Sequence, residues 1–488
     1  MLGFSRQRLY TVLAGIILVI AGLFIHSSIF GVAICILLAM VVLYDEKIGI
    51  LFLIILVPIR AFLTVYNPGF KLIGDIIILF LLLKIFYNNR KNLRGLFQFH
   101  PFEYAFFAFL IVGAVSALIT GVSIQAIIIQ IRAFGLFYLL YYIVKRLTVT
   151  EQDISDISVA TVVFGVVLSL QGLVEKISVR TLLLPEVWQN MELAYTNAQR
   201  VYGLMGGPNE TGIFLLISFF IGFNLLKSAK GKGKILLFSS LILIATVFIL
   251  TYSRGAALTI IAFLPVYMIV SRKFTFIKPL IIIGLSAFLL FFVVEKVTGM
   301  VEDYQTQQAA DPNNGEVPKD DKPSKIPNSE KGMNRFSGAF SEENIALSGE
   351  DGRVYYFKKA LMVFKDRPIM GYGFGTYGGS ATLIYSSPIY KQYGILGNFY
   401  SDNQYTQLIA ETGTLGIILI GAFVIFLLKI TWDLRNKFQF SPILIYFIIG
   451  AIVSGAVYNI LENDVFTMFY FLILGYAYRF LNKKEKAI

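Results

Sequence analysis

The sequence is poor in charged residues, which make up only 15% of its 488 positions. A typical soluble domain carries about 25% charged residues. Apolar residues make up 57% of the chain, and the mean hydropathy is +0.72. A water-soluble globule cannot bury that much apolar surface, so the composition excludes this class of protein and indicates a membrane protein.

Cysteine and histidine are nearly absent. Cys35 is the single cysteine, which excludes an intramolecular disulfide and a cysteine-based metal site. The two histidines, His26 and His100, lie far apart in the chain. We therefore expect neither a metal site nor a cofactor.

Long apolar runs take the place of the missing charge. A membrane-spanning helix needs about 20 mostly apolar residues. Candidate spans lie near 11–26, 29–44, 48–66, 72–87, 102–120, 124–144, 157–176, 211–226, 235–252, 255–270, 277–295, 404–430, 442–461 and 465–481. The sequence predicts an all-α, polytopic membrane helix bundle of about 14 (12–14) spans.

The net charge of +12 reflects membrane topology. If the N-terminus is cytoplasmic, lysine and arginine gather in every cytoplasmic turn, as the positive-inside rule requires. We therefore expect a multi-pass protein of the cell membrane with both termini in the cytoplasm. This distribution does not indicate a nucleic-acid partner.

The predicted spans divide the chain into three parts. Residues 1–295 form the first eleven spans, 296–403 form an extracytoplasmic loop domain, and 404–488 form the last three spans and a cytoplasmic tail. Within the loop domain, residues 300–335 are polar and rich in proline, aspartate and lysine, which predicts a flexible segment. Residues 352–366 predict an amphipathic helix that ends before Pro368. Its apolar face consists of Val354, Phe357, Leu361 and Phe364.

Three motifs lie on the predicted outer side. Residues 200–212, RVYGLMGGPNETG, include Arg200 and Asn209, and residues 251–258, TYSRGAAL, include Arg254. Residues 401–416, SDNQYTQLIAETGTLG, include Asp402 and Asn403.

Each motif has a structural alternative. An arginine at the membrane interface often anchors topology, Asp402 precedes a helix as an N-cap does, and the glycines permit close packing. The combination favours a functional reading. Arginine is suited to bidentate phosphate contacts, and a carboxylate such as Asp402 can accept a proton. Transfer from a lipid diphosphate needs both groups.

At these residues the sequence resembles the O-antigen ligase and O-antigen polymerase-like family. The family's Arg-x-x-x-Leu pattern appears at 254–258, and its His-Asn-x9-Gly-x-x-Gly pattern appears at 402–416 with Asp402 in the histidine position. Residues 352–376, which include Arg353 and the stretch from Gly371 to Thr376, match a further family segment. GLMGGPNETG resembles the family's Arg-Gly-Pro-Asn segment. The aspartate favours a polymerase over a ligase.

The resemblance implies a metal-independent, inverting glycosyltransferase on the outer face of the membrane. It would join polyprenyl-diphosphate-linked repeat units of an acidic cell-wall polysaccharide. Its partners would be the lipid-linked donor and acceptor, membrane lipids, and a flippase or chain-length protein. The expected catalytic residues are Asp402, Arg254 and Arg353, and the expected substrate-binding residues are Arg200, Asn209, Asn403 and Gly373.

Two other functions stay open from the sequence. A ligase would transfer finished glycan to an acceptor, and a flippase or transporter would move the lipid-linked glycan across the membrane. A transporter should place charged residues along a central path, whereas the motifs of this chain lie on one side.

Overall fold

The computed structural model describes residues 5–193, 195–271, 274, 276–310, 352–395, 397–435, 437–438 and 440–485. These residues form helices and loops, and none of them lies in a β-strand. The predicted all-α architecture is therefore confirmed.

The helices up to residue 310 are α1 (Arg6–Leu23), α2 (Ser28–Tyr44), α3 (Glu46–Leu56), α4 (Arg60–Tyr66), α5 (Ile73–Asn88), α6 (Leu93–Leu96), α7 (Pro101–Thr120), α8 (Ile124–Gly135), α9 (Tyr138–Val144), α10 (Glu151–Ile177), α11 (Glu186–Gln189), α12 (Tyr195–Ala198), α13 (Pro208–Leu225), α14 (Gly231–Leu250), α15 (Arg254–Ser271) and α16 (Ile277–Ala310). The later helices are α19 (Arg353–Asp366), α20 (Tyr390–Tyr393), α21 (Gln404–Leu434), α22 (Ser441–Ser454) and α23 (Asp464–Glu485). Short 3₁₀ helices cover Pro68–Leu72, Gly203–Met205, Ala381–Leu383 and Ile460–Glu462.

Each predicted span coincides with a helix or a bent pair of helices, but the count of about 14 is not confirmed. Within the described ranges, seven helices are long and apolar enough to cross a membrane: α1, α7, α10, α13, α14, α16 and α21. Counting each of two bent pairs as one span gives nine. The pair α3 and α4 bends by 78° next to Pro58, which cannot donate a backbone hydrogen bond, and α8 and α9 bend by 52°. With 14 residues, α22 is about 21 Å long, which is less than a typical hydrocarbon core.

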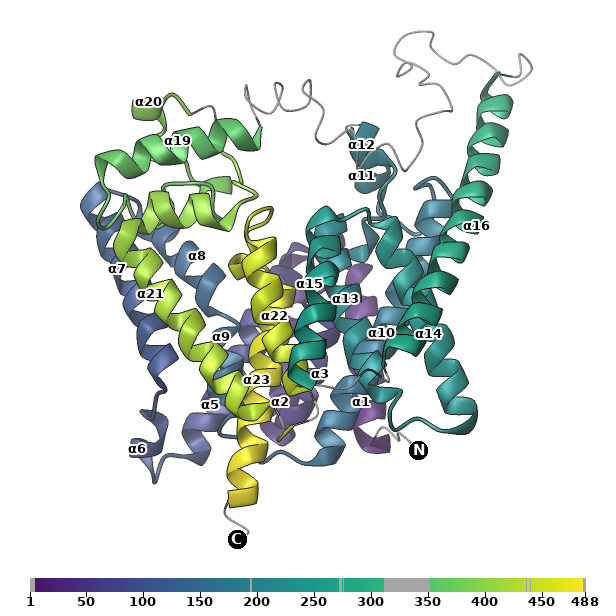
Figure 1. Cartoon of the computed structure of the whole chain (residues 1–488), viewed down its shortest axis with the longest axis horizontal. Helices are drawn as coiled ribbons and strands as arrows, with labels where there is room; N and C mark the ends of the chain where they lie inside the picture. Colours follow the sequence, from purple (N-terminus) through teal and green to yellow (C-terminus); the bar gives the residue numbers. More distant parts are fainter. Residues whose placement is uncertain are drawn as a thin grey trace.

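The long helices run side by side in one bundle (Figure 1). In this view α1 begins and α23 ends at the lower end, whereas α19 and α20 lie across the upper end. Of the predicted loop domain, residues 296–310 continue α16 as far as Ala310. Residues 311–351, which include most of the segment predicted to be flexible, lie outside the described residues.

The amphipathic helix predicted at 352–366 is present as α19, but it buries a different face. Ala360 and Val363 are fully buried, while Val354, Phe357 and Leu361 are 37%, 47% and 37% exposed. The reason is a local aromatic core. The Tyr356 ring stacks on Phe399, and the backbone oxygen of Tyr356 accepts a hydrogen bond from the Tyr377 hydroxyl. Three of the four residues in the predicted apolar stripe are therefore exposed, and Phe364 is half-buried.

A glycine-rich segment at 371–379 connects α19 to the bundle. Its backbone N–H groups at Gly375, Thr376 and Tyr377 donate to one carboxylate oxygen of Glu411, at 2.8, 3.0 and 3.1 Å. Phe374 inserts between helices of the bundle and packs 5.4 Å from the ring of Phe134. The segment is thus held from both sides by groups within the protein.

Gly373 illustrates how closely this segment approaches α7. Its φ is +93°, and a Cβ there would lie 1.9 Å from the backbone nitrogen of Ala117. We expect Gly373→Ala to lower the unfolding free energy by at least about 2 kcal/mol through clash and backbone strain. Thermal unfolding in detergent measures this effect.

Gly284→Ala is the matched control, because no heavy atom lies within 4 Å of a Cβ at that position. Alanine is also the better helix former, so the control should unfold at the wild-type temperature or above it. Equal unfolding temperatures for the two variants would contradict the tight approach at Gly373.

Candidate functional site

A cavity of about 330 Å³ lies among α13, α15 and α22. Its polar wall contains Arg200, Asn209, Ser253, Arg353, Asp402 and Tyr458, which come from distant parts of the chain. Deeper along α13, the wall becomes apolar at Ile213, Leu216 and Ile217. This arginine cavity therefore combines a polar end with an apolar interior.

Arg200 is held in place by neutral oxygen atoms. Its guanidinium donates to the backbone oxygen of Thr251 at 2.9 Å and to the side-chain oxygen of Asn209 at 2.8 Å. The same Asn209 oxygen accepts from the Ser253 hydroxyl at 3.1 Å. Asn209 thus orients Arg200 in the cavity wall, and both residues belong to one hydrogen-bonded cluster.

The local sequence explains why Asn209 lies at this position. Gly206 has a φ of +77°, which lets the chain turn sharply, and Pro208 occupies the first turn of α13. Proline suits that position because its missing N–H has no partner in the helix anyway. The N-terminus of α13 therefore lies beside Arg200, and a helix N-terminus favours an anion.

Arg353 and Asp402 form the opposite side of the polar wall. Their closest charged atoms are 3.7 Å apart, and Arg353 also donates to the backbone oxygen of Val457 at 3.2 Å. Partial burial raises the pKa of the Asp402 carboxyl, while Arg353 and then Arg200 act in the opposite direction. Asp402 also has a φ of +47°, an unusual backbone conformation for a residue other than glycine. The carboxylate therefore lies within the field of both arginines.

Arg254 is the first residue of α15, and its neighbours Ser253 and Gly255 both line the cavity. The backbone position is thus at the rim of the site. The side chain of Arg254 lies outside the described residues.

Two other predicted site residues have contacts of a different kind. Asn403 caps α21, since its side-chain oxygen accepts from the N–H groups of Tyr405 and Thr406 at 3.0 and 3.1 Å. Gly373 is packed against Ala117 and does not line the cavity. The structure thus brings Arg200, Asn209, Arg353 and Asp402 together, and leaves Gly373 apart from them.

Tyr458 in the cavity wall and Glu210, which is hydrogen-bonded to it, were not singled out in the sequence. The Tyr458 hydroxyl donates to the carboxylate of Glu210, which lies in the first turn of α13. Asn463 contacts the same hydroxyl at 3.4 Å. Glu210 follows Asn209 in the sequence, so the motif at 200–212 could have identified Glu210 as a candidate site residue. Tyr458 follows a short helix and carries no local pattern.

One comparison with known proteins finds a related family. Residues 239–421 match the O-antigen ligase family model. The matched segment includes Arg353 and Asp402 and begins after Arg200 and Asn209. No curated protein matches the chain. The match supports a relationship to the O-antigen ligase-like family and a membrane glycan ligase or polymerase type of enzyme.

The Asp402 environment leads to a prediction about protonation. We expect Arg353→Ala to raise the pKa of Asp402 further, because burial persists while the main group favouring the carboxylate is lost. The protonated carboxyl should then persist to higher pH. Infrared difference spectra measure this from the carboxyl stretch, assigned by its loss in Asp402→Asn.

Arg94→Ala serves as the control, because Arg94 is exposed on α6 at the other end of the bundle. It should leave the titration of Asp402 unchanged. A titration in Arg353→Ala that is unshifted, or shifted to lower pH, would contradict the electrostatic assignment.

Proposed function

We propose that the protein is a glycan polymerase of the cell membrane. It joins polyprenyl-diphosphate-linked repeat units of an acidic cell-wall polysaccharide resembling teichuronic acid, at the outer face. One observation carries the proposal: Arg200, Arg353 and Asp402 line one cavity although they are far apart in sequence. The family match across 239–421 supports the same type of enzyme.

The donor diphosphate suits the arginine side of the cavity. During transfer, the bond between the anomeric carbon and the diphosphate oxygen breaks, and the leaving polyprenyl diphosphate gains negative charge. Arg200, Arg353 and Arg254 stabilise this charge through bidentate hydrogen bonds. Positive groups that are fixed in advance stabilise the transition state without reorganising during the reaction.

The acceptor is a sugar hydroxyl of another lipid-linked unit. Its oxygen attacks the anomeric carbon from the face opposite the diphosphate, which inverts the configuration, and its proton passes to Asp402. The raised pKa of Asp402 suits it as a base, since proton transfer is most effective when the pKa approaches the working pH. Glu210, hydrogen-bonded to Tyr458, provides a second carboxylate beside the site.

A ligase is the second candidate, because the matching family model is described as O-antigen ligase. Asp402 replaces the histidine that the ligases carry, and we take this as favouring the polymerase. A flippase is less consistent with the site. The two arginines and Asp402 line one cavity, whose deeper wall along α13 is apolar rather than charged.

Transfer by the purified protein tests the role of the arginines. We expect Arg200→Ala, Arg353→Ala and Arg254→Ala each to slow polymer formation from lipid-linked repeats by about 10²-fold or more, the usual effect of removing one group that stabilises developing charge. Asp402→Ala should be similarly slow, and Asp402→His should retain more activity because histidine can also accept a proton. Gel analysis of the glycan products provides the rates.

Arg94→Ala should polymerise at the wild-type rate. Normal rates in the Arg200 and Arg353 variants would exclude the proposed site. A deletion strain separates the functions: outer-leaflet accumulation of single repeats supports the polymerase, inner-leaflet accumulation a flippase, and long unattached polymer a ligase.

A further inference from the structure

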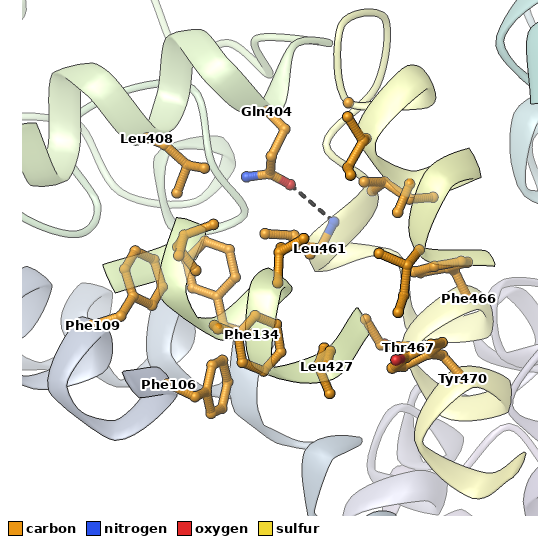
Figure 2. Close-up of a pocket in the computed structure, with 18 of the residues that line it drawn as sticks. Phe106, Phe109, Phe134, Gln404, Leu408, Leu427, Leu461, Phe466, Thr467 and Tyr470 are labelled. Carbon is orange, nitrogen blue, oxygen red and sulfur yellow. Dashed lines mark hydrogen bonds between the residues drawn. The ribbon is translucent and has the colours of Figure 1, made fainter. Parts of the chain in front are cut away.

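A second cavity, of about 100 Å³, lies among α7, α8, α21, α22 and α23 (Figure 2). Phenylalanine and aliphatic side chains make up most of its wall, among them Phe106, Phe109, Phe134, Leu408, Phe423 and Leu427. We refer to it as the apolar cavity.

Two polar side chains in this wall are hydrogen-bonded within the protein, whereas the Tyr470 hydroxyl is buried without a hydrogen-bond partner among the described residues. The Gln404 side-chain oxygen accepts from the backbone N–H of Leu461 at 2.9 Å, as the dashed line in Figure 2 shows. Thr467 donates to the backbone oxygen of Asn463 at 2.8 Å. A single unpaired hydroxyl offers a sugar few hydrogen bonds, so this mostly apolar space suits a hydrocarbon group better.

The apolar cavity adjoins the arginine cavity. Ile460 and Phe466 line both spaces, so the two share a wall. On the other side, the apolar cavity is lined by Tyr405 of α21 and Ile452 of α22, both 44% exposed on the outer surface of the bundle. The Tyr405 hydroxyl donates to the backbone oxygen of Ile452, which joins the two helices at this rim. The space thus extends between the bundle surface and the polar site.

We infer that the apolar cavity binds the first section of the isoprenoid chain of a lipid-linked substrate whose diphosphate lies in the arginine cavity. This inference rests on the proposed function. The anionic diphosphate matches the arginine cavity, and the branched hydrocarbon chain next to it matches the adjoining apolar cavity. An apolar cavity of about 150 Å³ accepts a benzene-sized molecule, so this smaller space holds a short section of the chain and the rest stays in the bilayer.

The binding energy has a specific origin. A chain that leaves the bilayer exchanges one apolar environment for another, so the hydrophobic effect contributes little. The gain comes from dispersion contacts with walls that otherwise face a void. Narrowing the cavity should therefore weaken chain binding and leave head-group binding intact.

Two soluble probes separate the head from the tail. Binding of geranylgeranyl diphosphate and of inorganic pyrophosphate to the full-length protein in nanodiscs is measured by calorimetry. Ala451 lines the apolar cavity from α22, and Ala451→Leu fills part of it. We expect this variant to bind geranylgeranyl diphosphate about tenfold more weakly and pyrophosphate as the wild type does. Arg353→Ala should weaken both.

Ala33→Leu, at an exposed position of α2, is the matched control and should bind both probes normally. If Ala451→Leu also loses pyrophosphate binding, Val424→Phe narrows the cavity from α21 and repeats the test. Unchanged geranylgeranyl diphosphate binding in the narrowed variant would overturn the inference while leaving the proposed function intact. Failure of the wild type to bind either probe would overturn both.

Discussion

The fold depends on one constraint: polar groups buried in a membrane bundle must find partners within the protein. Glu103 is fully buried and meets Lys145 at 2.6 Å, and Asp75 meets Arg132 at 2.6 Å. Glu411 is buried among helices and accepts three backbone N–H groups from the glycine-rich segment. Each of these charges is used to hold one element against another.

The same constraint explains the geometry of the candidate site. The glycine-rich segment is hydrogen-bonded to Glu411 of α21, and α21 begins two residues after Asp402. The segment also packs with α19, which begins at Arg353. The buried carboxylate thus connects the elements that carry the two charged residues. Arg200 is positioned separately, through Asn209 at the start of α13.

Much of the fold follows from the sequence, because apolar runs of helical length report burial in lipid directly. The predicted segments all became helices or bent pairs. The sequence did not show which of these segments form straight helices long enough to cross a membrane. Pro58 marks one break, but the bend after Gly135 has no proline, and packing decides it.

The site was predictable where residue chemistry was distinctive. Arg200, Asn209, Arg353 and Asp402 stood out as polar residues beside apolar helices, and they line one cavity. Three other features depend on tertiary contacts that the sequence does not show. Gly373 meets α7, α19 turns a different face inward, and Tyr458 reaches Glu210 across 248 positions of the chain.

The central claim is that the arginine cavity holds the diphosphate of a lipid-linked glycan. An experimental structure of the full-length protein with a non-hydrolysable polyprenyl-diphosphate sugar tests this most directly. The account predicts diphosphate density within hydrogen-bonding distance of Arg200 and Arg353, with the sugar's anomeric carbon facing Asp402. Diphosphate density at the opposite end of the bundle, with an empty arginine cavity, would contradict it.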